Sequence, residues 1–198
     1  TGTWLGSTPE LILSGNQSAW HTVALAGTKP IVNGTEQPWD SKNKQEQEYV
    51  AQYVKTQLEH YGVDPAVKGP IDISAGKVTH LVSHFDFEME DRSRLGDLLK
   101  LLHPTPAVCG TPKEYAFQFI TGQEPHSREY YSGFVGQLDP QGQTNLYVNL
   151  RCMHIVDRCC TLYAGGGLLA TSQLQEEWSE TENKMQTMKA LLGANKTS

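Results

Sequence analysis

Short stretches of alternating hydrophobic and polar residues recur along the chain and predict β-strands. Residues 3–14 and 19–26 predict two strands that are joined at Gly15-Asn16. Residues 77–87 are rich in β-branched and aromatic side chains and predict another strand. From residue 130 onward the pattern predicts an antiparallel meander of three strands, over residues 130–139, 144–156 and 159–169.

Apolar residues spaced three or four apart predict helices between these strands. One helix follows Asp40 and ends before Gly62, and its apolar stripe consists of Val50, Val54, Leu58 and Tyr61. Residues 92–102 predict a second helix, and Thr111 is expected to cap a third, with Pro112 at its first position. A last helix should run from about Ser172 to Leu192. Its expected buried face consists of Leu174, Trp178, Thr181, Met185, Met188 and Leu192.

The order of these elements indicates the fold class. Paired strands are interleaved with helices and a meander closes the chain, which is typical of α+β proteins rather than of a doubly wound parallel sheet. We therefore predict an α+β fold of largely antiparallel sheets flanked by helices. The length of 198 residues favours one domain over residues 1–198.

Composition and charge exclude several classes of function. The formal net charge is −6, and neither a block of like charges nor a basic stripe occurs, so nucleic acid is not expected as a partner. The apolar runs are far shorter than the roughly 20 residues that a membrane span requires. The chain begins with Thr1 and shows no signal peptide, so we expect a piece of a longer cytoplasmic protein.

Cysteine and histidine spacing does not support a zinc site. Cys109, Cys152, Cys159 and Cys160 lack paired spacing, and we expect reduced thiols. His80 and His84 share one face of a predicted strand, but they would stand about 13 Å apart at roughly 3.3 Å per residue. One zinc ion cannot bridge that distance.

Two acidic positions on the predicted helices are candidates for metal binding. Glu46 lies on the apolar stripe that continues to Val50, and a carboxylate facing a core needs a partner such as a metal ion. A helix-start residue favoured by the helix dipole explains Glu46 equally well. Glu180 and Lys184 are four residues apart on the last helix, and from the residues alone an exposed ion pair is the favoured interpretation.

A polar face near the end of the meander could bind a carboxylate ligand. Arg151 follows Tyr147 and Asn149 on the polar side of a predicted strand, and three glycines (165–167) come one strand later. A guanidinium grips a carboxylate with two hydrogen bonds, and glycines allow backbone N–H groups to approach closely. A solvent-facing sheet surface is the alternative interpretation.

Taken together, nine ordered segments resemble the chorismate-binding enzymes, the family of anthranilate, aminodeoxychorismate, salicylate and isochorismate synthases. They span essentially the whole chain, and their order is more specific than any single match. The segments are Ser7-Thr8-Pro9-Glu10-Leu11, ALAGT (24–28), Glu46 with Tyr49-Val50, HLVS (80–83), LHPTPAVCGTPK (102–113), Glu124 through Arg128 to Tyr131-Ser132-Gly133, LRC (150–152), LYAGGG (162–167) and EW-x-ET-x-x-K (177–184).

Two segments favour one branch of this family. Covalent aminodeoxychorismate synthases carry a lysine at the position of Ala26, and the LHPTPAVCG stretch is similar to that of isochorismate synthases. The resemblance therefore implies Mg²⁺-dependent isomerisation of chorismate to isochorismate, for menaquinone or siderophore synthesis, without an amidotransferase subunit. Salicylate synthase, another chorismate-utilising enzyme and a non-catalytic ligand-binding fragment of the same fold are the alternatives.

The resemblance also implies roles for individual residues. Glu10 would be the general acid, and Glu46 and Glu180 would hold Mg²⁺. The substrate chorismate would be bound by Ala26, Gly27, Thr28, His80, Tyr131, Arg151, Gly165, Gly167 and Lys184.

This chain departs from the family pattern at two points. The family's domain begins with further strands, one of which carries the lysine that activates water, so residues 1–198 would be a C-terminal portion of the domain and inactive alone. Glu46 is followed by Gln47, where many relatives have histidine.

Overall fold

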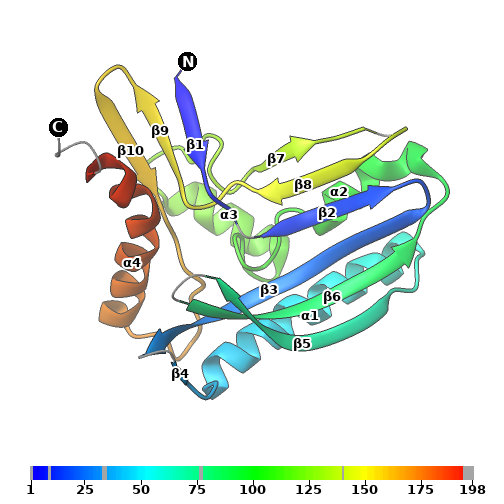
Figure 1. Ribbon diagram of the computed structural model, residues 1–198, viewed down its shortest axis with the longest axis horizontal. Helices are drawn as coiled ribbons and strands as arrows, with labels where there is room; N and C mark the ends of the chain where they lie inside the picture. The colour runs from blue at the N-terminus through cyan, green and yellow to red at the C-terminus, as the bar shows by residue number, and fades with distance from the viewer. Residues whose placement is uncertain (1, 9, 33–34, 76–77, 140, 194–198) are drawn as a thin grey trace.

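A computed structural model of the protein describes residues 2–8, 10–32, 35–75, 78–139 and 141–193 (Figure 1). Its strands are β1 (Thr3–Gly6), β2 (Leu11–Asn16), β3 (Ala19–Val32), β4 (Thr35–Glu36), β5 (Ala66–Ala75), β6 (Val78–Glu88), β7 (Phe134–Gln137), β8 (Thr144–Val148), β9 (Cys152–Val156) and β10 (Cys159–Tyr163). Its helices are α1 (Ser41–Tyr61), the 3-10 turn η1 (Arg92–Arg94), α2 (Leu95–Leu102), α3 (Lys113–Gln123) and α4 (Leu174–Gly193).

A seven-stranded sheet and the helices α1 and α2 enclose the core. The strands follow the order β5-β6-β3-β2-β8-β7, with β4 paired to β3, and every pairing is antiparallel. Buried side chains from β2, β3 and β6 pack against those of α1 and α2, and Ile12, Trp20, Val54, Phe85 and Leu98 are examples. This arrangement confirms the predicted α+β fold of antiparallel sheets flanked by helices.

Helix α1 begins and ends where the sequence predicts. The Asp40 side chain accepts a hydrogen bond from the backbone N–H of Asn43 at 2.7 Å, and Gly62 closes the helix with a left-handed φ of 103°. The predicted stripe of Val50, Val54, Leu58 and Tyr61 is buried.

The first predicted strand is wrong as a single element, because it divides between two sheets. β1 pairs with β9 in a three-stranded sheet of order β1-β9-β10, whereas β2 pairs with β3 and β8. β1 ends at Gly6 and β2 begins at Leu11, so the break falls between these two residues. The following turn is also shifted, because Gly15 and Asn16 still pair with β3.

The strand predicted over residues 144–156 also divides, into β8 and β9. Arg151 stands between them with a left-handed φ of 43°, so it lies in a turn rather than on a strand face. The backbone N–H of Ser7 donates to the carbonyl oxygen of Arg151 at 3.2 Å, which ties the β1–β2 connection to this turn. The polar strand face expected around Arg151 is therefore corrected to a turn between two sheets.

One strand was missed, and two further expectations are wrong. β5 was not predicted, and α3 starts after Pro112 with no side-chain cap, so Thr111 does not cap it. In α4 only Met188 of the predicted face is fully buried, whereas Leu174 is 88% exposed and Trp178 is 61% exposed.

No helix among the described residues is both long and apolar enough to cross a membrane.

Candidate active site

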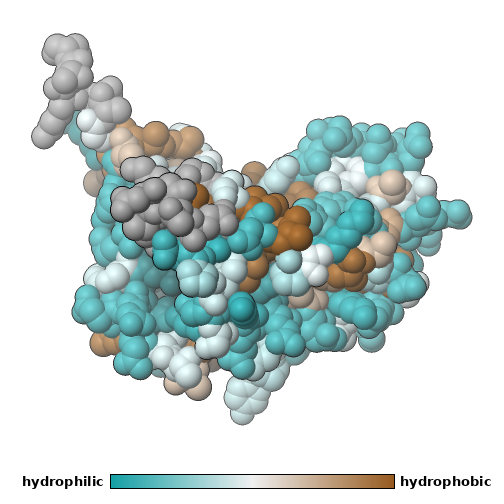
Figure 2. Space-filling view, turned by 60° about the horizontal axis from the view of Figure 1, so that its bottom comes forward, coloured by the Kyte–Doolittle hydropathy of each residue, from teal (hydrophilic) through white to brown (hydrophobic). Residues whose placement is uncertain are grey.

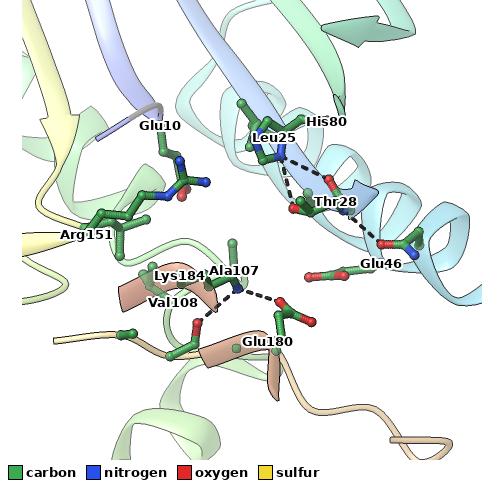
Figure 3. Close-up of a pocket in the computed structure, with 18 of the residues that line it drawn as sticks. Glu10, Leu25, Thr28, Glu46, His80, Ala107, Val108, Arg151, Glu180 and Lys184 are labelled. Carbon is green, nitrogen blue, oxygen red and sulfur yellow. Dashed lines mark hydrogen bonds and ion pairs between the residues drawn. The ribbon is translucent and has the colours of Figure 1, made fainter. Parts of the chain in front are cut away.

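A cavity of about 300 Å³ lies where the end of β3, the start of α1, the glycine-rich segment after β10 and α4 meet (Figure 3). Its size is that of a small-ligand site. The residues that sequence reasoning singled out all line it: Glu10, Ala26, Gly27, Thr28, Glu46, His80, Tyr131, Arg151, Gly165, Gly167, Glu180 and Lys184. They come from segments far apart in the sequence, and the fold brings them together.

Glu10 is a buried carboxyl group at one side of the cavity. It is 5% exposed, and its Oε1 accepts a hydrogen bond from Thr105 Oγ1 at 3.0 Å. Its backbone carbonyl accepts from the N–H of Val148 at 2.9 Å, which anchors the residue to β8. Burial raises the pKa of Glu10 to about 7, against the opposing effects of the Thr105 hydrogen bond and Lys184. Glu10 can therefore keep its proton near neutral pH.

A bulge in β3 forms the opposite wall. Pairing between β3 and β6 shifts between Ala26 and Thr28, and Gly27 has a left-handed φ of 76°. Thr28 Oγ1 lies 3.0 Å from His80 Nδ1, and the Gly27 carbonyl oxygen lies 3.3 Å from the same nitrogen. Burial, together with the positive charge of Arg151, lowers the pKa of His80, so the imidazole is neutral.

Carboxylates gather on the α1 and α4 side of the cavity. Glu46 and Glu180 both face it (Figure 3), and burial and the charge of Glu180 raise the pKa of Glu46. Glu177, which was not predicted as a site residue, is 7% exposed, and its buried Oε2 has no hydrogen-bond partner among the residues that the structure describes. Three carboxylates this close would repel one another unless cations compensate them.

Two lysines supply part of that compensation. Lys184 Nζ lies 2.6 Å from Glu180 Oε1 and donates to the Gly165 carbonyl at 3.1 Å (Figure 3). Lys42 Nζ binds Glu177 Oε1, which also accepts from Ser172 Oγ. The expected ion pair between Glu180 and Lys184 therefore forms, but it faces a cavity rather than an open surface.

The glycine segment leaves room for its neighbours. A Cβ atom on Gly165 would lie 2.7 Å from Tyr131 Oη, and one on Gly167 would lie 3.2 Å from Glu46 Oε1. The Tyr131 ring stacks on Tyr163 with centroids 5.4 Å apart, which fixes its position. Glycine at these two positions thus lets the backbone approach the cavity closely.

Zinc binding is not supported in the described part of the chain. No group of three or more histidine, cysteine, aspartate or glutamate side chains there could hold a metal ion by itself. His84 Nδ1 lies 3.3 Å from His21 Nε2, away from His80. The four cysteines are free, as expected for thiols.

The donor set does fit Mg²⁺, which usually takes one or two carboxylates and completes its shell with water and substrate oxygens. Glu46 and Glu180 are two such carboxylates, and the repulsion between them favours a cation.

Lys42, Asn43 and Arg128 also line this cavity, and Glu177 accepts a hydrogen bond from Lys42. The sequence analysis predicted none of the four as site residues. Asn43 lies near the start of α1, one turn before Gln47. That position was a sequence signal for a residue at the cavity. Arg128 binds Glu124 through two nitrogens and donates to the Val108 carbonyl at 3.0 Å. Lys42 and Glu177 meet across 135 residues of sequence, so no local pattern indicates their pairing.

Comparison with known proteins gives consistent matches over nearly the whole chain. A family model described as "Chorismate binding enzyme" matches residues 1–193. The chain is 34% identical to isochorismate synthase DhbC of Bacillus subtilis over an alignment of 203 positions, which covers 98% of this chain and 51% of that protein.

Solved structures agree. The menaquinone-specific isochorismate synthase MenF of Escherichia coli superposes with a TM-score of 0.83 at 31% identity, over 96% of this chain and 46% of that one. Anthranilate synthase component I of Streptococcus pneumoniae shares the fold, with a TM-score of 0.79 at 24% identity over 93% of this chain and 43% of that one. The chain spans about half the length of the relatives it matches.

Proposed function

The chain belongs to the chorismate-binding enzyme family, and from that premise we propose that the whole protein isomerises chorismate to isochorismate. The similarity to isochorismate synthases supports this branch. The observation that carries the proposal is the placement of a buried Glu10, whose pKa is raised to about 7 by burial, in one cavity with Glu46, Glu180 and Arg151. The isochorismate would serve menaquinone or siderophore synthesis.

The proposed reaction adds water at C2 of the ring and removes the hydroxyl group at C4. Glu10 would donate its proton to the leaving hydroxyl, which departs as water, and so act as general acid. A base must take a proton from the incoming water, so that the net change is an isomerisation. We propose that this base is a lysine preceding Thr1 in the longer protein, as the family resemblance implies.

Glu46 and Glu180 would hold Mg²⁺. When bound, this ion would offset the negative charge of the ring carboxylate. Arg151 and Lys184 would bind the carboxylates of the substrate, and the Gly165 and Gly167 backbone would allow close approach. Thr28, His80 and Tyr131 would line the pocket around the ring. No ammonia and no amidotransferase subunit enter this proposal.

Product analysis of the full-length protein tests the reaction. Chorismate with Mg²⁺ should give isochorismate in chromatography, and added ammonium should change nothing. Salicylate with pyruvate would identify a salicylate synthase instead. An aminated product formed only with ammonium would place the protein in another branch of the family.

The metal role has its own test. Glu46→Gln and Glu180→Gln should each raise the Mg²⁺ concentration needed for half-maximal rate and lower the rate by about a hundredfold or more. Glu48→Gln is the matched control, because Glu48 is an exposed residue of the same helix. A Glu180→Gln protein that behaves like this control would show that Glu180 only pairs with Lys184.

A further inference from the structure

The bulge in β3 needs hydrogen-bond acceptors from outside the sheet. A bulge leaves backbone groups of its own strand without ladder partners. At this bulge, Gln47 Oε1 accepts from the N–H of Ala26 at 2.9 Å, and Asn43 Oδ1 accepts from the N–H of Thr28 at 3.0 Å. Asn43 and Gln47 are one turn apart on α1. Side chains on one face of this helix therefore bind the backbone N–H groups on both sides of Gly27.

Gln47 is fully engaged in this role. Its side chain is 2% exposed, and its Nε2 donates to the Ala24 carbonyl at 3.0 Å and to Ser83 Oγ at 3.1 Å. The backbone N–H of Ala26 can only donate and the carbonyl of Ala24 can only accept, so the amide orientation is fixed by its partners.

The bulge in turn determines which nitrogen of His80 carries the proton. The Gly27 carbonyl oxygen lies 3.3 Å from His80 Nδ1 and can only accept a hydrogen bond. The Thr28 hydroxyl, 3.0 Å from Nδ1, can accept as well as donate. Both neighbours are therefore compatible with a hydrogen on Nδ1 and an unprotonated Nε2 in the neutral ring. Nε2 is buried and has no partner within the described residues, and His80 is 2% exposed and lines the cavity.

We propose that Asn43 and Gln47 are positioning residues that fix the Gly27 carbonyl against His80 and so hold the His80 ring at the cavity wall with its proton on Nδ1. The proposal rests on the proposed function only where its test uses chorismate as the substrate.

Nuclear magnetic resonance of the full-length protein without substrate tests the first half. Labelling with ¹⁵N-histidine and recording two-bond ¹H–¹⁵N spectra distinguishes the two tautomers. The His80 signals are those lost in a His80→Asn protein. We expect a protonated Nδ1 and an unprotonated Nε2; a proton on Nε2 would overturn the proposal.

Two substitutions test the second half. Gln47→Met keeps the length of the side chain and removes its three hydrogen bonds, and Asn43→Ala removes the bond to Thr28. Each should shift the His80 signals toward a mixture of tautomers and lower kcat/KM for chorismate by about tenfold or more, which is at least 1.4 kcal/mol. Gln52→Met, an exposed position on the same helix, should match the wild type in both measurements.

The outcomes separate this proposal from the proposed function. Folded Gln47→Met and Asn43→Ala proteins with wild-type His80 signals would overturn the positioning role. If Gln47→Met does not fold, Asn43→Ala alone decides, because it leaves the buried Gln47 network intact. Absence of any turnover by the wild type would refute the proposed function, whereas the tautomer measurement would still stand or fall by itself.

Discussion

At the scale of single residues, Glu10 couples the stability of the protein to pH. Its pKa is raised from 4.5 to about 7 by burial, so the folded state binds more protons than the unfolded state between these values. Stability therefore falls as pH rises from about 4.5 to about 7. The shift corresponds to a contribution on the order of 3 kcal/mol that is present in acid and lost above neutral pH.

Glu10→Gln should remove this dependence. Glutamine keeps an oxygen that can accept from Thr105 and carries no charge. We expect the variant to be more stable than the wild type at pH 8 and closer to it at pH 5, in urea unfolding of the full-length protein. Equal pH profiles for the two proteins would show that Glu10 is not the titrating group.

The same proton governs the expected activity. A general acid works only in its protonated form, so kcat/KM for chorismate should fall as pH rises through about 7. Glu10→Gln should lose about two to four orders of magnitude in rate. A rate that keeps the wild-type pH profile in a weakly active Glu10→Gln protein would assign the falling limb to another group.

At the scale of elements, alanine substitutions at two neighbouring glycines between β10 and α4 should differ in the size of their effect. Gly165→Ala would place its methyl group against Tyr131 Oη, at 2.7 Å, whereas the nearest atom to a methyl group on Gly166 is 3.6 Å away. The Tyr131 ring cannot shift freely because it stacks on Tyr163. Gly165→Ala should therefore raise KM for chorismate by about tenfold or more, and Gly166→Ala should have a clearly smaller effect. Equal effects would contradict this packing argument.

The sequence predicted correctly those helices and strands whose position depends on neighbouring residue types, such as capping residues and runs of β-branched side chains. Asp40 and Gly62 mark the ends of α1, and β6 follows its run of β-branched and aromatic residues. β5 was missed because Gly69-Pro70 interrupts it and because its side chains are exposed at the sheet edge. The division between β8 and β9 depends on a left-handed backbone at Arg151, a conformation for which arginine gives no signal.

The candidate site was predicted mainly from the family resemblance and only in part from the spacing of apolar and polar residues. Glu46 stood out as a carboxylate on an apolar stripe, but the roles of Glu10, His80 and Tyr131 came only from the family resemblance. Lys42 and Glu177 were missed because their contact exists only in the folded chain. Periodicity identifies a side chain that faces inward, and it carries no information on what the side chain meets there.

At the scale of the whole molecule, much apolar surface lies open. Figure 2 shows apolar side chains gathered in the middle of one face, among hydrophilic ones. β5 exposes Val67, Ile71 and Ile73, and α3 exposes Tyr115 and Phe119 at 80% and 67%. Patches of this kind usually mark surfaces that another chain or segment covers. The relatives are about twice as long as this chain, which fits such a cover.

Residues 1–198 alone should therefore associate and remain inactive. The open apolar side chains favour contact between copies, so sedimentation of the purified chain should show a mass that rises with concentration.

Chorismate turnover by this chain should be negligible, because the acid Glu10 is present whereas the base is proposed to lie before Thr1. The assay compares this chain with the full-length protein at equal concentration, with Mg²⁺. Comparable turnover by the two would mean that a residue within 1–198 activates the water. Lys42 and Lys184 would then be the first candidates, since both line the cavity.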